Sequence, residues 1–233
     1  MQFAYLIGSL SLSLIWVVIW FSLKSKESRA EMVKVSLATS LLGFTEPIFV
    51  PAYWNPPTLF NLASKTGFDL ESLVFAFAVG GIAVAAYELF WKGRHQEITQ
   101  EERHHPQHKF HLWALLAAPV SFLILFLATS LNPIYSTVTA LLVGAVATFY
   151  CRPDLIRKMV SSGLLFLSVY FFFFLVFNLL FPGYTEEVWN LKAISGILIL
   201  KVPLEELLFA FSFGLMWSSV YEHTSWRIYK EKP

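Results

Sequence analysis

Residues 204–222 read LEELLFAFSFGLMWSSVYE, and residues 70–88 read LESLVFAFAVGGIAVAAYE. The two stretches align without a gap, and nine of nineteen positions are identical, including the pair Glu71 and Glu205. Two apolar helices often share leucine and phenylalanine through composition alone. Shared glutamates and a shared glycine are not explained in that way. The stretch at 204–222 therefore predicts a chain that contains two copies of one helical unit.

The composition is that of a polytopic membrane protein. The 233 residues are 56% hydrophobic and 14% charged, and the mean hydropathy is +0.59. A helix of about 20 apolar residues crosses a hydrocarbon core, and only helices or closed barrels satisfy their backbone hydrogen bonds there. The runs lack the alternation of barrel strands, so we predict an all-α fold with seven transmembrane helices, at 3–23, 31–50, 69–91, 111–130, 133–151, 158–181 and 201–222.

The basic residues predict the orientation of these helices. Seven crossings place fourteen of the seventeen lysines and arginines on one side of the membrane. These are Lys24, Lys26, Arg29, Lys34, Lys92, Arg94, Arg103, Lys109, Arg152, Arg157, Lys158, Arg227, Lys230 and Lys232. Lys65, Lys192 and Lys201 fall on the other side. Because cytoplasmic loops are rich in such residues, we expect the N-terminus outside and the C-terminus inside. We also expect an integral protein, located in a prokaryotic cytoplasmic membrane.

The two copies predict the domain organisation. Trp54-Asn55 and Trp189-Asn190 recur at nearly the same distance before the repeated helix. We therefore predict two parallel three-helix repeats, at 1–92 and 133–233. A cytoplasmic loop and a linking helix at 93–132 would join them and restore the orientation of the second repeat.

Four glutamates near the outer helix ends are the candidate catalytic groups: Glu46, Glu71, Glu205 and Glu206. An ionisable side chain in a membrane normally faces the bundle interior. Acidic residues in a first helical turn also complement the helix dipole. The dipole alone does not explain why a glutamate stands at the same position in both copies of the repeated helix. Burial beside another carboxylate favours a protonated carboxyl, which can act as a general acid. We expect Glu205 to be the proton donor, tuned by Glu206 and Glu71.

Aromatic side chains accompany these carboxyls. Aromatic faces stabilise cations, so an acid beside an aromatic wall suits chemistry through a carbocation, although phenylalanine also fills lipid-facing surface. The expected substrate contacts are Phe75, Phe77, Phe209, Phe211, Phe213, Trp217, Trp54, Trp189, Asn55 and Asn190. At the inner helix ends, Glu88 and Glu222 each follow a tyrosine. We expect a structural role for them, reaching the interface or pairing with Lys92 or Arg227.

The stretch VPLEELLF at 202–209, after a Trp-Asn loop, resembles the small membrane lycopene cyclases of bacteria, archaea and fungi. That family has two three-helix domains, separate or fused, and a proline-x-glutamate-glutamate signature that falls here on Pro203, Glu205 and Glu206. An acidic residue that the family places before the tryptophan has its candidate in Glu46, which we expect to serve as a base. The resemblance covers roughly 3–91 and 133–224.

The first copy departs from the signature. Asp69 replaces the proline and Ser72 the second glutamate, which leaves Glu71 as the match, and Asn178 stands at the rough counterpart of Glu46. One intact signature fits either a single acid centre or a related domain without cyclase activity.

The resemblance implies an intramolecular lyase or isomerase without a cofactor. It would cyclise the end group of a linear carotenoid within the membrane through a tertiary cation. The expected partners are membrane lipid and the carotenoid or another isoprenoid, and a homo-oligomer is left open. We expect no nucleic acid partner, because the net charge is only +1. The alternative is a non-catalytic isoprenoid-binding or transport protein with the same interior. The sequence has no GxGxxG motif, no aspartate-rich prenyl-diphosphate motif and no mid-membrane lysine for a retinal Schiff base.

The predicted cytoplasmic loop at 91–111 contains a histidine cluster, and histidine is a common metal ligand. Its members are His104, His105, His108 and His111. We expect no metal site, because there is one cluster only and Pro106 interrupts it. A solvated interfacial loop is the favoured interpretation, and metal binding by the loop remains open.

Overall fold

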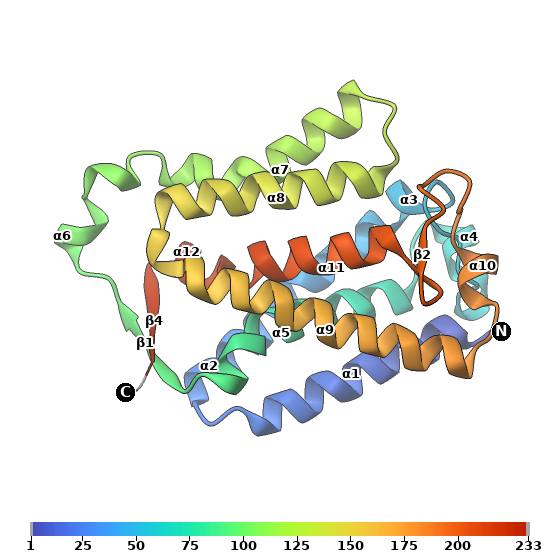
Figure 1. The fold of residues 1–233 in the computed structure, drawn as a ribbon, viewed down its shortest axis with the longest axis horizontal. Coiled ribbons are helices and arrows are strands. Elements are labelled where there is room, and N and C mark those ends of the chain that lie inside the picture. Colours follow the sequence, from blue (N-terminus) through green and yellow to red (C-terminus); the bar gives the residue numbers. More distant parts are fainter. Residues whose placement is uncertain (1, 232–233) are drawn as a thin grey trace.

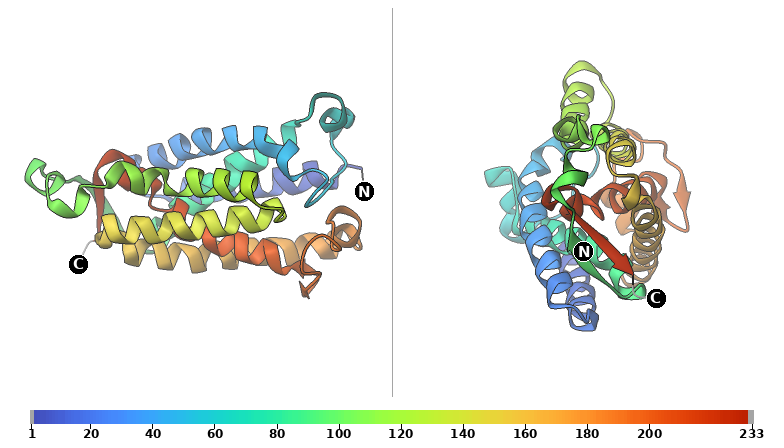
Figure 2. Two further views of the ribbon diagram at one scale, coloured as in Figure 1. Left: turned by 90° about the horizontal axis from the view of Figure 1, so that it is seen from above. Right: turned by 90° about the vertical axis from the view of Figure 1, so that its left-hand side faces the viewer.

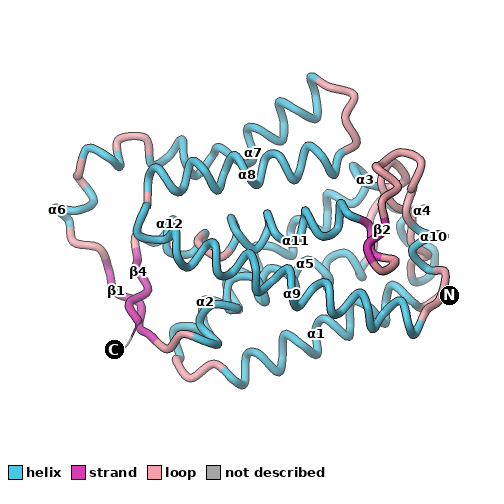
Figure 3. Tube along the Cα trace, in the orientation of Figure 1, coloured by secondary structure: helices cyan, strands magenta, loops and turns pink. Residues whose placement is uncertain are grey.

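The computed structural model describes residues 2–231 as an elongated helical bundle whose long helices run along its long axis (Figure 1, Figure 3). Within these residues, five helical segments are long and apolar enough to cross a membrane. Their α-helices are α1 (Ala4–Ser22), α5 (Leu70–Phe90), α7 (His111–Ala128), α8 (Pro133–Cys151) and α9 (Ile156–Leu180). The structure confirms a mostly helical chain with several membrane helices.

The other two predicted crossings are broken. The first consists of α2 (Lys26–Ser40), the 3₁₀ turn η1 (Leu41–Thr45) and the short α3 (Glu46–Phe49). A Cβ on Gly43 in η1 would lie 2.8 Å from the backbone of Leu73, so the break lets the chain approach α5 closely. The second comprises α11 (Leu204–Trp217) and α12 (Val220–Ser225). Between these helices, the hydroxyls of Ser218 and Ser219 bond to carbonyls three residues earlier. A total of seven crossings therefore stays a prediction.

Short elements close the two ends of the bundle (Figure 1). One end carries η2 (Leu59–Asn61), α4 (Leu62–Thr66), α10 (Tyr184–Val188) and the hairpin of β2 (Leu198–Ile199) with β3 (Val202–Pro203). We call it the α4 end. The opposite end carries β1 (Gly93–Glu97) paired antiparallel with β4 (Arg227–Glu231), together with α6 (Gln100–Arg103), η3 (Pro106–His108) and η4 (Pro153–Leu155). We call it the β1 end.

The charges divide between these two ends. Lys65 lies in α4, and Lys192 and Lys201 lie in the loops beside α10 and the hairpin, all at the α4 end. The other group of fourteen lysines and arginines lies at or towards the β1 end, except for Lys232, which falls outside the described residues. The chain begins near the α4 end and reaches the β1 end at β4 (Figure 1). Which end faces the cytoplasm stays a prediction from the charge asymmetry.

Helices α5 and α11 occupy the centre of the bundle and run in the same direction (Figure 1). Helix α5 packs on α1, α2 and α9, and α11 packs on α8 and α9. The glycine shared by the repeated stretches lies at a close helix contact in both. A Cβ on Gly80 would meet Thr39 of α2 at 2.3 Å, and one on Gly214 would meet the Ser162 carbonyl of α9 at 2.9 Å. Helix α7 lies at the periphery against α8 (Figure 2).

The repeated Trp-Asn loops pair with each other. Trp54 and Trp189 form an isolated antiparallel bridge. The Asn55 N–H donates to Val188 at 2.8 Å, and the Asn190 N–H donates to Tyr53 at 2.8 Å. Each asparagine thus donates to the residue that precedes the tryptophan of the other loop, as a local two-fold relation requires. The layout of two complete repeats remains a prediction.

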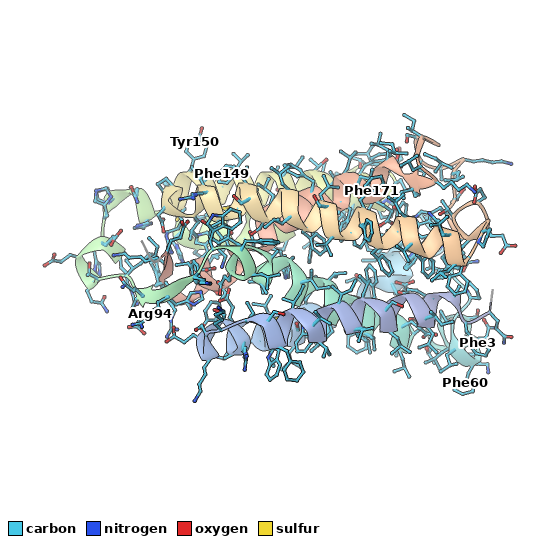
Figure 4. The ribbon with its side chains drawn as sticks, turned by 60° about the horizontal axis from the view of Figure 1, so that its bottom comes forward. Phe3, Phe60, Arg94, Phe149, Tyr150 and Phe171 are labelled. Atoms are coloured by element: carbon cyan, nitrogen blue, oxygen red, sulfur yellow. The ribbon has the colours of Figure 1, made fainter. Side chains whose placement is uncertain are left out.

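The outer surface of the bundle is apolar over much of its length. Tyr150 on α8 is 82% exposed and projects outward, while Arg94 of β1 and the pair Phe3 and Phe60 lie at opposite ends (Figure 4). Leu127 on α7 is 78% exposed. Exposed apolar patches of this extent mark a membrane surface, so the fold is that of an integral membrane protein.

Candidate active site

A cavity of about 490 Å³ lies inside the bundle, within the size range of small-molecule sites. Its walls come from α1, α2, α5, α7, α8, α9 and α11, together with η1, α3, α12 and the adjoining loops, and are almost entirely apolar. Two carboxyl side chains line it, those of Glu46 and Glu206. Both residues are 6% exposed. The cavity therefore combines two buried acidic groups with an apolar interior.

Three donors hold the carboxylate of Glu206. Its Oε1 accepts hydrogen bonds from the Tyr53 hydroxyl at 2.6 Å and from Trp189 Nε1 at 3.1 Å. Its Oε2 accepts from the Tyr170 hydroxyl at 2.8 Å. Burial, and next the neighbouring Glu206 charge, raise the pKa of Tyr53, which lies in the loop after α3, so its hydroxyl remains a donor. Glu206 thus accepts every hydrogen bond that it makes, which suits an ionised carboxylate fixed in one orientation.

Glu46 has a different environment. It begins α3, and its Oε1 has no hydrogen-bond partner within residues 2–231. Ser72 also lines the cavity, where its hydroxyl pairs with Tyr5 at 2.8 Å and with Asp69 at 3.2 Å. Burying a carboxylate oxygen without a hydrogen-bond partner costs free energy. The surroundings of Glu46 therefore favour the neutral carboxylic acid over the carboxylate.

Aromatic rings connect the two acidic positions. The ring centroid of Trp54 lies 4.9 Å from that of Tyr5 and 5.7 Å from that of Trp189. On α11, Phe209, Phe213 and Trp217 form a stacked ladder with centroid separations of 5.3 and 5.1 Å. All of these rings line the cavity. They present π faces and edges to any ligand that enters it.

The structure divides the residues selected from the sequence into two groups. The first group lines the cavity and comprises Glu46, Glu206, Phe75, Phe209, Phe213, Trp217, Trp54 and Trp189. The second group does not line it and comprises Glu71, Glu205, Phe77, Phe211, Asn55 and Asn190. Phe77 packs on Trp16, and Phe211 lies beside Gly163 at the contact of α11 with α9.

Glu71 and Glu205 hold loops in equivalent ways. Glu71 Oε1 accepts the Leu59 N–H at 2.6 Å, and Glu205 Oε1 accepts the Ser195 N–H at 2.9 Å. Glu205 also accepts the Tyr135 hydroxyl at 2.7 Å. The glutamate shared by the two stretches thus anchors the loop that precedes its own helix.

Sequence reasoning missed the tyrosines that line the cavity. Tyr5, Tyr53 and Tyr170 all lie in its wall. Tyr53 directly precedes the repeated Trp-Asn pair, and this position was a signal that could have identified it. Tyr170 stands among phenylalanines on α9, and nothing in its local sequence distinguishes it.

A second buried polar cluster lies towards the β1 end. Glu31, Glu88 and Glu222 surround Lys158 and His95. The expected pairing of Glu88 or Glu222 with Lys92 or Arg227 is wrong, because Lys158 and His95 are the nearest cations.

The five members of this cluster come from five different elements. Lys158 Nζ lies 2.9 Å from Glu88 and 3.5 Å from Glu31, and it also contacts Glu222. Burial lowers the pKa of His95, but hydrogen bonds to the three carboxylates outweigh it and raise this pKa to about 12. The cluster therefore ties α2, α5, α9 and the loop strand β1 to α12.

Residues 132–224 match the family model described as lycopene cyclase. This segment of the chain is similar to the lycopene cyclases. The matched segment contains α8, α9 and α11 and supplies Glu206, Tyr170 and Trp189 to the cavity. Glu46 and Tyr53 come from the chain before the matched segment, so both halves form the site. The match indicates a carotenoid cyclase-like function. Comparisons with curated proteins and with solved structures give no match.

Proposed function

We propose that the chain is a membrane enzyme that cyclises the end group of a linear carotenoid by acid catalysis, without net oxidation or reduction. The observation that carries this proposal is the carboxylate of Glu206. It is held by three donors inside an apolar, aromatic cavity and lies within the segment that is similar to the lycopene cyclases. A substrate of this class is insoluble in water, and an apolar cavity inside a membrane bundle suits it.

The two carboxyls support different roles in the reaction. Glu46, whose Oε1 is unpaired, donates its proton to a terminal double bond of the carotenoid. A new C–H bond forms, and a tertiary carbocation remains. A second double bond of the substrate attacks this cation, which closes the six-membered ring by a new C–C bond and moves the positive charge into the ring.

Glu206 completes the sequence. Its carboxylate stabilises the cation electrostatically and then accepts a proton from a ring carbon, whose C–H electron pair becomes the ring double bond. Glu46 is left ionised and Glu206 protonated. Between turnovers Glu206 releases its proton to solvent and Glu46 takes one up, which restores the enzyme. One proton enters the substrate and one leaves it.

The aromatic wall protects the cation. Phe209, Phe213 and Trp217 present rings along the cavity, and a desolvated cation–π contact is worth about 2 kcal/mol. Apolar walls also exclude the water that would trap the cation as an alcohol. In this proposal Glu46 takes the role of proton donor that the sequence suggested for Glu205. Glu206 takes the role of base that the sequence suggested for Glu46.

Pigment analysis of lycopene-accumulating cells that express the chain tests this function. The wild-type chain should produce cyclic carotenoid, and Glu206→Gln and Glu46→Gln should each lower the yield per folded protein by about 10²-fold or more. Glu205→Gln is the matched control, because it changes the adjacent carboxyl on the same helix outside the cavity. A wild-type chain without product, present and folded, would refute the cyclase. Loss of cyclic product in Glu205→Gln, together with normal yield in Glu206→Gln, would refute the role given to Glu206.

A further inference from the structure

Three potential metal ligands meet at the β1 end, apart from the cavity. His108 ends η3, His111 begins α7 and Cys151 ends α8. One sulfur or nitrogen atom from each of the three lies within 4.8 Å of the other two. Cys151 and His108 are 5% and 7% exposed. The linking segment and the lycopene cyclase-like segment thus each contribute to one group of thiol and imidazole side chains, in which Cys151 and His108 are buried and His111 is half-buried.

We propose that Cys151, His108 and His111 bind one Zn²⁺ ion. Cys151 Sγ lies 3.7 Å from His108 Nδ1 and 3.4 Å from His111 Nδ1. In tetrahedral zinc sites the Zn–S bond is about 2.3 Å and the Zn–N bond about 2.0–2.1 Å, which places sulfur and nitrogen about 3.5–3.6 Å apart. The two observed separations bracket that value, so both sulfur–nitrogen pairs already have the spacing of a zinc site.

A thiol hydrogen bond is a less complete explanation of this geometry. A thiol can donate its single proton to one Nδ1 atom, and it can accept the N–H of the other only weakly. A thiolate bound to a metal has no such limit, because both nitrogens then bind the ion rather than the sulfur. One thiolate with two imidazoles is a donor set for zinc, whereas magnesium and calcium prefer oxygen ligands.

The surroundings hold the ligands in place. The ring of Trp226 stacks on His111 at 3.9 Å and meets His108 edge-on at 5.3 Å. His223 lies beside His111, with ring centroids 4.6 Å apart, and is 2% exposed. Its Nε2 has no hydrogen-bond partner in the described part of the chain. A water molecule would complete the four-coordinate site.

The charges near the site permit a cation. Arg152 follows Cys151 directly, but its guanidinium is paired with Asp154 at 2.8 and 2.6 Å. The Cys151 thiolate offsets one charge of the ion. A bound ion would fasten the start of the linking helix to the end of α8, which gives the site a structural role in joining the linking segment to the lycopene cyclase-like segment.

Cobalt titration of the full-length protein in detergent tests the proposal. The protein is treated with a chelator, and Co²⁺ is added as a probe, since a tetrahedral site with a thiolate gives visible d–d bands and a near-ultraviolet charge-transfer band. We expect both bands to saturate at one Co²⁺ per chain and to disappear when Zn²⁺ displaces it. Zn²⁺ should also raise the Tm of the metal-free protein.

Variants separate this site from the other histidines. Cys151→Ser and His111→Ala should weaken Zn²⁺ binding at least ~10-fold and abolish the Zn²⁺-dependent rise in Tm. His104→Ala and His105→Ala are the matched controls, because they remove exposed histidines of the same loop and should change neither readout. The Tm of each metal-free variant, compared with that of the metal-free wild type, shows whether the variant is folded.

Three outcomes would overturn the proposal. These are a wild-type protein without saturable Co²⁺ or Zn²⁺ binding, undiminished binding in folded Cys151→Ser, and equal loss of binding in His104→Ala or His105→Ala. None of the readouts depends on cyclisation, so the result is independent of the proposed activity.

Discussion

Replacing Lys158 with methionine should destabilise the bundle by about 3–5 kcal/mol, the cost of removing one partner from a buried ion pair. Lys158 is 4% exposed and contacts three carboxylates, those of Glu31, Glu88 and Glu222. Methionine has a similar length and leaves little empty space. The cost therefore comes from electrostatics, because His95 alone would then face the three carboxylates.

Thermal unfolding of the purified protein in detergent, followed by tryptophan fluorescence, measures this effect. For a chain of this size, 1 kcal/mol shifts the Tm by about 2–4 °C, so we expect a fall of about 6–20 °C. Neutralising a carboxylate as well, in Lys158→Met with Glu31→Gln, should recover part of the loss. Arg157→Met is the matched control, because its side chain is 68% exposed and its bridge to Glu231 should contribute less than ~1 kcal/mol. A loss below ~1 kcal/mol in Lys158→Met would refute the reasoning.

Three further predictions concern other contacts. Because the pKa of His95 is raised to about 12, its stabilising contribution should be complete below pH ~6.5 and decline as the pH rises towards 12, so His95→Gln should flatten a plot of Tm against pH above neutrality. Tyr170→Phe removes a 2.8 Å hydrogen bond to the carboxylate of Glu206 and should cost about 1.5–3 kcal/mol, measured by thermal unfolding, and also lower the cyclic pigment per folded protein. Gly81→Ala would place a Cβ 2.2 Å from the Ser36 hydroxyl and should lower stability by about 1–3 kcal/mol, measured as a fall in Tm.

The long helices were predictable because length and hydropathy define them. The predicted crossings at 69–91 and 133–151 differ from α5 and α8 by at most one residue at either end. The breaks were not predictable from the same pattern. Gly43 allows a close approach to α5, and that requirement appears only when the two segments are packed together.

The choice between adjacent glutamates also required the structure. Glu205 and Glu206 are neighbours on a helix that is apolar on most sides. The pattern of hydropathy therefore does not show which of the two faces the interior of the bundle. The donors to Glu206 come from two loops and from another helix. Lys158 was equally ambiguous, since a lysine at a helix end is expected to reach the interface, and its three buried partners are distant in sequence.

The central claim is that the cavity carboxyls cyclise a linear carotenoid by adding one proton and removing another. The most direct measurement is the mass spectrum of the carotenoid formed when the purified protein, reconstituted with lycopene, is incubated in deuterium oxide. The account predicts one stable deuterium atom per ring, because the proton is added to one carbon and lost from a different one. The rest of the product should have the mass of an isomer of the substrate. Cyclic product without deuterium, or with a mass changed by two hydrogens, would contradict the mechanism.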